Sequence, residues 1–220
     1  MPPVGDGNHM NKLEKALSRF LNHGELTGLL AQVLACASKK GRVSYHDVDK
    51  IANDSLEDVL LLGSEWRLLL PVRTLKSAAW EDRLLLAEPG ALYEVPNIVK
   101  YLVEDASKTS NWNSEYAITE LFREMGEPFW ERMPRLVECL REQAKGYRIS
   151  AIQIKEICSE LDMGDRVDAL IAELKGSGVM SPKLGSLAEV SRAGTPIYEL
   201  NPSLLRDEGK KMIIKDNSEC

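Results

Sequence analysis

Apolar residues recur at helical spacing in the stretch DRVDALIAELKGSGVMSP, residues 165–182. Apolar side chains at positions i, i+3, i+4 and i+7 line one face of a helix, and here they are Val167, Leu170, Ile171 and Leu174. Glycines close the pattern, and VMSP then has the character of a strand. The stretch therefore predicts a short helix followed directly by a strand.

A second helix is predicted just before this stretch, in YRISAIQIKEICSEL, residues 147–161. Two or three strand-like residues lead to Ser150, and Gln153 follows three positions later, which is the spacing of a capping box. Upstream, GRVSYHDVDKIANDSL has the same layout, with Ser44 in the cap position. Ser150 follows Ser44 by 106 residues.

The same offset continues on both sides of these caps. Val43 corresponds to Ile149 in the short strand, and Tyr93 in LYEVPN corresponds to Tyr198 in IYELNP at an offset of 105. Small changes of offset are what loop insertions produce. Because cap, strand, turn and closing strand recur in one order, the chain is predicted to contain two copies of one unit.

Each copy reads helix, short strand, helix, turn, helix, strand, loop, strand, and this order resembles the winged-helix superfamily over about 75 residues of each half. The resemblance implies a mainly α fold with small β-hairpins, in which two winged-helix domains are joined by linker helices. The expected divisions are a tail and short helix at 1–22, a first domain at 23–97, a helical linker at 98–127, a second domain at 128–205 and a frayed tail at 206–220.

The first copy has the longer wing. WRLLLPV (66–72) and RLLLAE (83–88) are both predicted as strands that precede LYEVP. In the second copy the corresponding segment, KLGSLAEVSRAGT (183–195), is predicted as a loop.

Composition narrows the class of protein. With 44% hydrophobic and 28% charged residues the chain is typical of a globular protein, and its net charge of −6 offers no general attraction to phosphate backbones or anionic membranes. No apolar run is long enough to span a membrane, and no signal pattern opens the chain. Cys36, Cys139 and Cys158 lie on apolar helical stripes, so we expect reduced thiols without a disulfide in a cytoplasmic protein.

The motifs of common enzyme classes are absent from the sequence. There is no phosphate-binding glycine loop, no nucleophile elbow and no pair of histidines at metal-binding spacing. HDVD (46–49) is better explained by acidic residues in the first turn of a helix, and Glu127 with Glu131 by a solvated helix face. We therefore expect no catalytic residue, no cofactor and no metal.

The four tryptophans divide by context. Trp66 and Trp130 lie on apolar stripes and are predicted to be core residues. Trp80 and Trp112 lie in loop-like contexts, where either side chain could anchor a partner.

The third helix of each copy is the one that enters the major groove in DNA-binding winged helices. The charge of this helix therefore indicates whether DNA or protein is the better partner. The first of these, NDSLEDVLLLGSEW, carries four carboxylates and no cation, which phosphates would repel. It also places leucines sideways or outward, which favours a contact with protein or burial against the linker helices in about equal measure. The candidate protein interface comprises Glu57, Leu60, Leu61, Glu65 and Trp80.

The alternative is DNA binding through the second copy and its wing. The outward positions of its third helix include Arg166, Ala169, Glu173 and Lys175, and the candidate nucleic-acid contacts are Arg166, Lys175, Lys183 and Arg192. A further basic cluster, Lys39, Lys40 and Arg42, precedes the first capped helix.

Together these features predict a non-enzymatic regulatory or adaptor protein whose winged helices bind a protein partner or a second copy of the chain. Acidic tandem winged helices of this kind occur in scaffolding assemblies such as the endosomal sorting complex II. A DNA-binding transcriptional regulator is the alternative.

Overall fold

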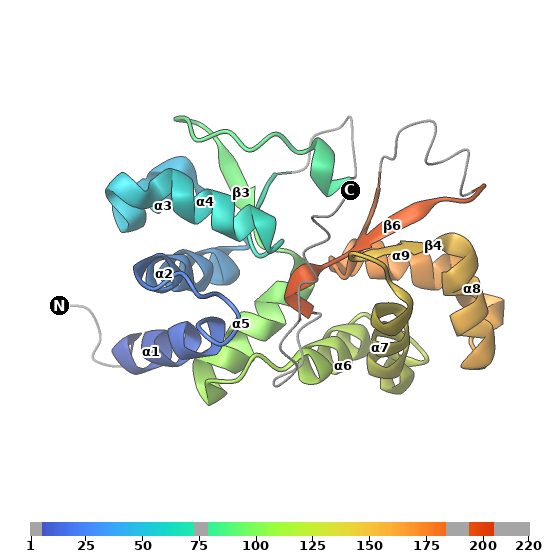
Figure 1. Cartoon of the computed structure of the whole chain (residues 1–220). Coiled ribbons are helices and arrows are strands. Elements are labelled where there is room, and N and C mark those ends of the chain that lie inside the picture. Colours follow the sequence, from blue (N-terminus) through green and yellow to red (C-terminus); the bar gives the residue numbers. More distant parts are fainter. Residues whose placement is uncertain (1–5, 73–78, 184–193, 205–220) are drawn as a thin grey trace, which may run out of the picture.

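The computed structural model describes residues 6–72, 79–183 and 194–204 (Figure 1). Its first part contains α1 (Asp6–Leu17), α2 (Glu25–Lys40), β1 (Arg42–Ser44), α3 (Tyr45–Ala52), the 3-10 turn η1 (Asn53–Ser55), α4 (Leu56–Glu65), β2 (Leu70–Pro71), η2 (Trp80–Asp82) and β3 (Leu92–Glu94). Two helices follow, α5 (Asn97–Thr109) and α6 (Ser114–Glu124). The last part contains η3 (Trp130–Arg132), α7 (Met133–Gln143), β4 (Arg148–Ser150), α8 (Ala151–Glu160), η4 (Gly164–Arg166), α9 (Val167–Ser177), β5 (Met180–Pro182), β6 (Ile197–Leu200) and η5 (Pro202–Leu204).

The described chain is mainly α-helical with two small antiparallel sheets of three strands each, as the hydrophobic pattern predicts. The strand orders are β1-β3-β2 and β4-β6-β5, so in each sheet the last strand lies between the other two. Val43 pairs with Tyr93 in the first sheet, and Ile149 pairs with Tyr198 in the second. The two sheets therefore repeat each other at the offsets of 106 and 105 residues seen in the sequence.

Both predicted capping boxes are present. Asp47 N donates to Ser44 Oγ at 3.2 Å, and Ser44 N donates back to the Asp47 carboxylate at 3.1 Å. In α8, Gln153 N donates to Ser150 Oγ at 3.3 Å, and Ser150 N donates to Gln153 Oε1 at 3.0 Å. Each box gives partners to amides that the first helical turn cannot satisfy itself, which explains why both helices begin at the same place in the repeat.

We call α2 to β3 (residues 25–94) the first unit and α7 to β6 (residues 133–200) the second unit. Figure 1 shows the first unit in blue to green and the second in olive to red, with α5 and α6 beneath them. α5 packs against α1, α2 and α6, while α6 packs against α7. The helices between the units are thus part of the packing of both, although the domain boundaries given above stay a prediction.

Of the two strands predicted in the first wing, one is shorter than predicted and the other is not formed. In WRLLLPV only Leu70–Pro71 is a strand. Arg67 has a positive φ of 53°, and the amides of Leu68 and Leu69 both donate to the Gly63 carbonyl. These residues therefore close α4 and do not extend the strand. RLLLAE forms no strand, since it pairs with no neighbouring strand among the described residues. Short runs of consecutive leucines are consistent with a buried strand, but they do not show whether a neighbouring strand is available for pairing. Most of KLGSLAEVSRAGT and the tail beyond Leu204 lie outside the described residues.

The two units contact each other through the loops that follow α4. Arg67 Nε donates to Glu199 Oε1 of β6 at 3.0 Å, and the Asn201 side-chain amide donates to the Arg67 carbonyl at 3.3 Å. The backbone amide of Trp80 donates to Ser181 Oγ of β5 at 2.9 Å. The tip of the first unit is therefore fastened to the sheet of the second.

Candidate functional site

The outward surface of α4 is acidic with one apolar side chain at its centre. Glu57, Asp58, Leu61 and Glu65 are exposed, and the side chains at 57, 61 and 65 follow one another along a single stripe. Leu61 is 60% exposed. We call these four residues the α4 face. Its charge and the outward position of Leu61 agree with the prediction from sequence.

Leu60 is not part of this surface. It is 1% exposed and belongs to the core together with Val59 and Leu62, so its predicted outward position is wrong. α4 packs against both α2 and α3. These two neighbours bury a wide arc of the helix surface, and Leu60 lies within that arc. The burial is therefore within the first unit, and α5 and α6 are not its main neighbours.

Trp80 and Trp112 are core residues, which reverses the prediction made from their loop-like contexts. Trp80 is 6% exposed, and the Arg67 guanidinium lies over its ring at 5.9 Å from the centroid. Trp112 is 9% exposed, and its indole NH donates to the Ser203 carbonyl at 2.9 Å. Both rings are covered by segments distant in sequence, which local context cannot reveal. Trp66 and Trp130, predicted as core residues, are half-buried.

Arg166 is half-buried, and two carboxylates hold its guanidinium. Its Nη2 lies 3.0 Å from Glu127 Oε2 and 3.2 Å from Glu173 Oε1. The Glu127 side chain is fully buried, and its other oxygen accepts from Phe129 N at 2.9 Å. We call Glu127, Arg166 and Glu173 the carboxylate–arginine triad. The outward positions predicted for Arg166 and Glu173, and the solvated position predicted for Glu127, are therefore wrong.

The triad contains two carboxylates for one cation, so one carboxyl retains a proton more readily than usual. Burial raises the pKa of Glu173 to about 7, its hydrogen bond and repulsion with Glu127 act in the same direction, and Arg166 opposes them. The triad connects the segment after α6 with the start and middle of α9. It therefore anchors the third helix of the second unit to the helices between the units.

The remaining candidate DNA contacts do not form a basic surface. Lys183 Nζ lies 2.5 Å from Glu81 Oε2, so its charge is used in a contact between the two units. Lys175 is exposed near the end of α9. Arg192 lies outside the described residues. Of the four predicted cations, the structure places Arg166 and Lys183 in internal ion pairs and does not gather them on one outward face.

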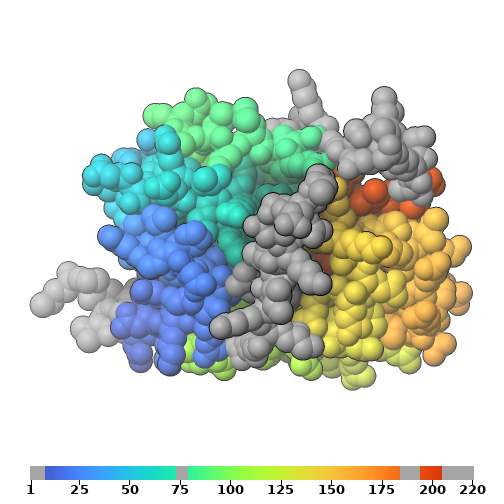
Figure 2. Space-filling model, in the orientation of Figure 1, coloured from blue at the N-terminus to red at the C-terminus, as the bar shows by residue number. Residues whose placement is uncertain are grey.

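Three leucines in the segment from η2 to the start of β3 are exposed, which the sequence pattern did not predict. Leu84, Leu86 and Leu92 are 72%, 42% and 47% exposed. Tyr45 N donates to the Ala91 carbonyl at 2.9 Å, which holds the end of this segment beside the start of α3. In Figure 2 the segment (light green) lies along the upper rim, above α3 and α4 (cyan). The run of three leucines in RLLLAE was the feature of the sequence that could have indicated an exposed apolar segment here.

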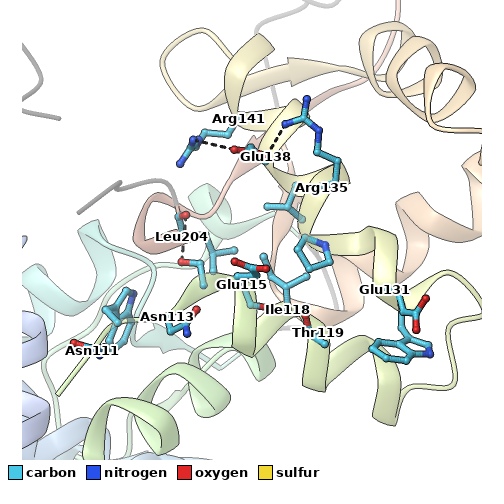
Figure 3. A pocket seen from close by; sticks show the side chains of 15 residues that line it. Asn111, Asn113, Glu115, Ile118, Thr119, Glu131, Arg135, Glu138, Arg141 and Leu204 are labelled. Atoms are coloured by element: carbon cyan, nitrogen blue, oxygen red, sulfur yellow. Dashed lines mark hydrogen bonds and ion pairs between the residues drawn. The ribbon is translucent and has the colours of Figure 1, made fainter. Parts of the chain in front are cut away.

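A groove of about 840 Å³ lies between the beginnings of α6 and α7 (Figure 3). Ile118, Val137 and Leu204 contribute apolar surface, and charged side chains form the rim. Glu138 lies 2.5 Å from Arg135 and 4.0 Å from Arg141, so these rim charges are paired with one another. The arrangement provides neither a nucleophile with a neighbouring base nor a surplus of one charge.

Reactive groups are similarly scarce in the parts of the chain that the structure describes. Cys36, Cys139 and Cys158 are free thiols, and burial raises the pKa of Cys158 to about 11, which disfavours the reactive thiolate. Within residues 6–72, 79–183 and 194–204, no three His, Cys, Asp or Glu side chains gather in a way that could hold a metal ion. None of the helices in these ranges has the length and apolar character needed to cross a membrane.

One protein-family model, for a family without an assigned function, matches residues 11–210, and the chain belongs to that family. No curated protein and no solved structure matches the chain.

Proposed function

We propose that this member of the family is a non-enzymatic tandem winged-helix adaptor that binds a protein partner through the α4 face of its first unit. The observation that carries the proposal is the composition of that face, in which three carboxylates surround one exposed leucine. The partner surface that fits it is basic, with an apolar recess for Leu61.

The assignment to the winged-helix class rests on element order and strand order. Each unit runs helix, strand, helix, 3-10 turn, helix, strand, strand, and the last strand lies between the first two in each sheet. In this arrangement α4 and α9 occupy the position of the helix that DNA-binding winged helices insert into the major groove. On α4 this position leaves Glu57, Leu61 and Glu65 exposed, which suits recognition of a macromolecule whose surface is complementary.

The electrostatics of α4 favour protein over DNA. Glu57, Asp58 and Glu65 carry no neighbouring cation within α4, so they would face phosphates without compensation. A basic protein surface would instead gain from the same charges through complementarity, which raises the association rate and selects the partner. Covering Leu61 adds an apolar contribution of about 25 cal/mol per Å² buried.

Self-association through the α4 face is less favourable than binding of a basic partner. Two copies related by a twofold axis would place the acidic stripe of one against the acidic stripe of the other. Like charges placed opposite each other in an interface cost several kcal/mol. The exposed leucines at 84, 86 and 92 offer further apolar area for contact with a different protein.

The second candidate is DNA binding through the second unit, supported by the exposed Lys175 on α9. The engagement of Arg166 by Glu127 and of Lys183 by Glu81 weighs against it, because ion-paired cations release fewer counterions on binding phosphates.

A photo-crosslinking amino acid placed at position 61 in cells tests the proposal. We expect a discrete protein adduct from position 61 that is lost when Glu57→Lys and Glu65→Lys are introduced together. Position 155, an exposed lysine on α8, serves as the matched control and is expected to give no such adduct. An adduct with a second copy of the chain would contradict the adaptor proposal and would show self-association through the α4 face instead.

Binding to DNA is measured separately, by fluorescence anisotropy with a labelled random duplex over a range of salt concentrations. We expect the wild-type protein not to bind the duplex at any of these salt concentrations. If wild-type protein binds the duplex and Lys175→Met weakens that binding, the transcriptional-regulator alternative takes the place of the proposal.

A further inference from the structure

A second groove, of about 480 Å³, lies where the two units meet. It is bounded by the end of α2, the strands of the first sheet, the start of α5 and the end of α9. Among the described residues, its charged lining consists of Lys40, Arg42, Arg83 and Lys100, together with the carboxylate of Glu94. Four cations thus gather in one place on a chain whose net charge is −6. We call this cavity the junction groove.

The single carboxylate does not neutralise this cluster. Glu94 Oε1 accepts from Arg83 Nη1 at 2.7 Å, so these two residues compensate each other. Lys100 Nζ donates to the neutral side-chain oxygen of Asn97 at 2.9 Å. Lys40 lies 3.7 Å from Asp47, a carboxylate that also serves the Ser44 cap. The groove therefore retains a surplus of positive charge, which destabilises the free protein unless an anion compensates it.

Arg83 is the buried member of the cluster. Its side chain is 9% exposed, and Nη1 also donates to the Pro71 carbonyl at 3.1 Å, which fixes the guanidinium in position. Its Nε is buried and has no hydrogen-bond partner among the described residues. The position of the Arg83 charge in the groove lining is therefore set by Glu94 and the Pro71 carbonyl, before any ligand binds.

The backbone around the groove allows a close approach. Gly41 is in the left-handed conformation at φ 76°, and a Cβ at that position would lie 3.8 Å from Lys100 Nζ. On the opposite side, Gly176 has no atom within 4 Å of the position of a Cβ, whereas a Cβ at Gly178 would lie 2.6 Å from Pro96 Cβ. Gly178 therefore allows the end of α9 to pack against the start of α5. The thirteen-residue helix α5 begins at this point, and the positive end of its dipole adds to the field of the cations.

We propose that the junction groove binds a small phosphate-bearing molecule, which bridges the two units. The volume lies within the range of small-molecule sites, about 300–1,000 Å³. Double-stranded DNA does not fit this location, because the groove lies between the two units, whereas a duplex is read by projecting elements that enter its grooves. The inference is independent of the α4 face, which contributes no residue to the groove.

The test uses the full-length protein and inorganic pyrophosphate as the probe, with isothermal titration calorimetry as the measurement. We expect binding that weakens with increasing salt. Lys100→Met and Arg42→Met each keep an apolar stem while removing one charge. A charge-assisted hydrogen bond contributes about 1.5–3 kcal/mol, so each variant should bind about tenfold more weakly or worse. Lys155→Met, on the far helix α8, should bind like the wild type.

Thermal melting of the same proteins separates a binding role from a structural one. Without pyrophosphate, Lys100→Met and Arg42→Met should melt at or above the wild-type temperature, since each relieves repulsion between like charges. With pyrophosphate, the wild type should gain stability and the two variants should gain less.

Absence of binding at millimolar pyrophosphate, or equal binding by Lys100→Met, Arg42→Met and wild type, would overturn the proposal. Tighter binding of a labelled duplex than of pyrophosphate, with the same dependence on Lys100 and Arg42, would overturn it in favour of a nucleic-acid contact. Neither result depends on the fate of the crosslink at position 61.

Discussion

Replacement of Arg166 by Met should destabilise the protein, because Arg166 is the only cation in the carboxylate–arginine triad. It lies 3.0 Å from the fully buried carboxylate of Glu127 and 3.2 Å from Glu173. Removing one partner of a buried ion pair costs about 3–5 kcal/mol, since the other charge remains buried without compensation. The Arg166 side chain is 29% exposed, so we expect a loss near the lower end, about 3 kcal/mol.

The loss should depend on pH in a defined direction. Arg166 lowers the pKa of Glu173, so its removal raises that pKa further and makes protonation of the triad more favourable. The deficit of Arg166→Met relative to wild type should therefore be largest above pH 7 and should shrink as pH falls towards 5.

Urea denaturation at pH 8 and at pH 5.5 measures both effects, and Lys175→Met is the matched control, on the helix that begins directly after Arg166. Lys175 is exposed, so its replacement should change the unfolding free energy by less than about 0.5 kcal/mol. A deficit for Arg166→Met below about 1 kcal/mol, or one of equal size at the two pH values, would refute the electrostatic account of the triad. If that variant instead keeps its stability and loses DNA affinity, Arg166 is a surface contact.

Glu173→Gln should remove a pH dependence of stability, because the folded-state pKa of Glu173, about 7, lies above its ordinary value of 4.5. Between these two pH values the folded state binds more protons than the unfolded state, so wild-type stability falls as pH rises through this window. Glu173→Gln should therefore be more stable than the wild type at pH 8 by about 1–3 kcal/mol in the same urea assay. Leu60→Ala should lower the unfolding free energy by about 2–5 kcal/mol, whereas Leu61→Ser should change it little; equal losses would mean that both leucines are core. Ser150→Ala should cost about 1 kcal/mol through loss of the cap of α8, and a neutral result would show that the capping box contributes no net stability.

Local patterns in the sequence were sufficient to predict the two capped helices and the first and last strands of both sheets, whereas the wing strands of the first copy were predicted wrongly. Ser44 and Ser150 cap helices through hydrogen bonds to residues three positions away, so a short stretch of sequence contains the whole motif. The offsets of 106 and 105 residues also hold in the strand register, where Val43 with Tyr93 repeats as Ile149 with Tyr198. The acidic surface of α4 could also be predicted from the sequence, because both the helical periodicity and the charged residues lie within the helix itself.

Contacts between distant segments decided the rest. The backbone of Trp80 is held by Ser181 and the charge of Arg166 by Glu127. Both partners are far away in the chain, and no local pattern encodes them. Leu60 and Leu61 are equally apolar, and only the packing of α4 against α2 and α3 determines that one is buried and the other exposed. The junction groove has the same origin, because Lys40, Arg83 and Lys100 belong to three separate segments. Hydrophobic periodicity specifies which face of an element is buried, but the folded arrangement of all elements determines which charges finally lie together.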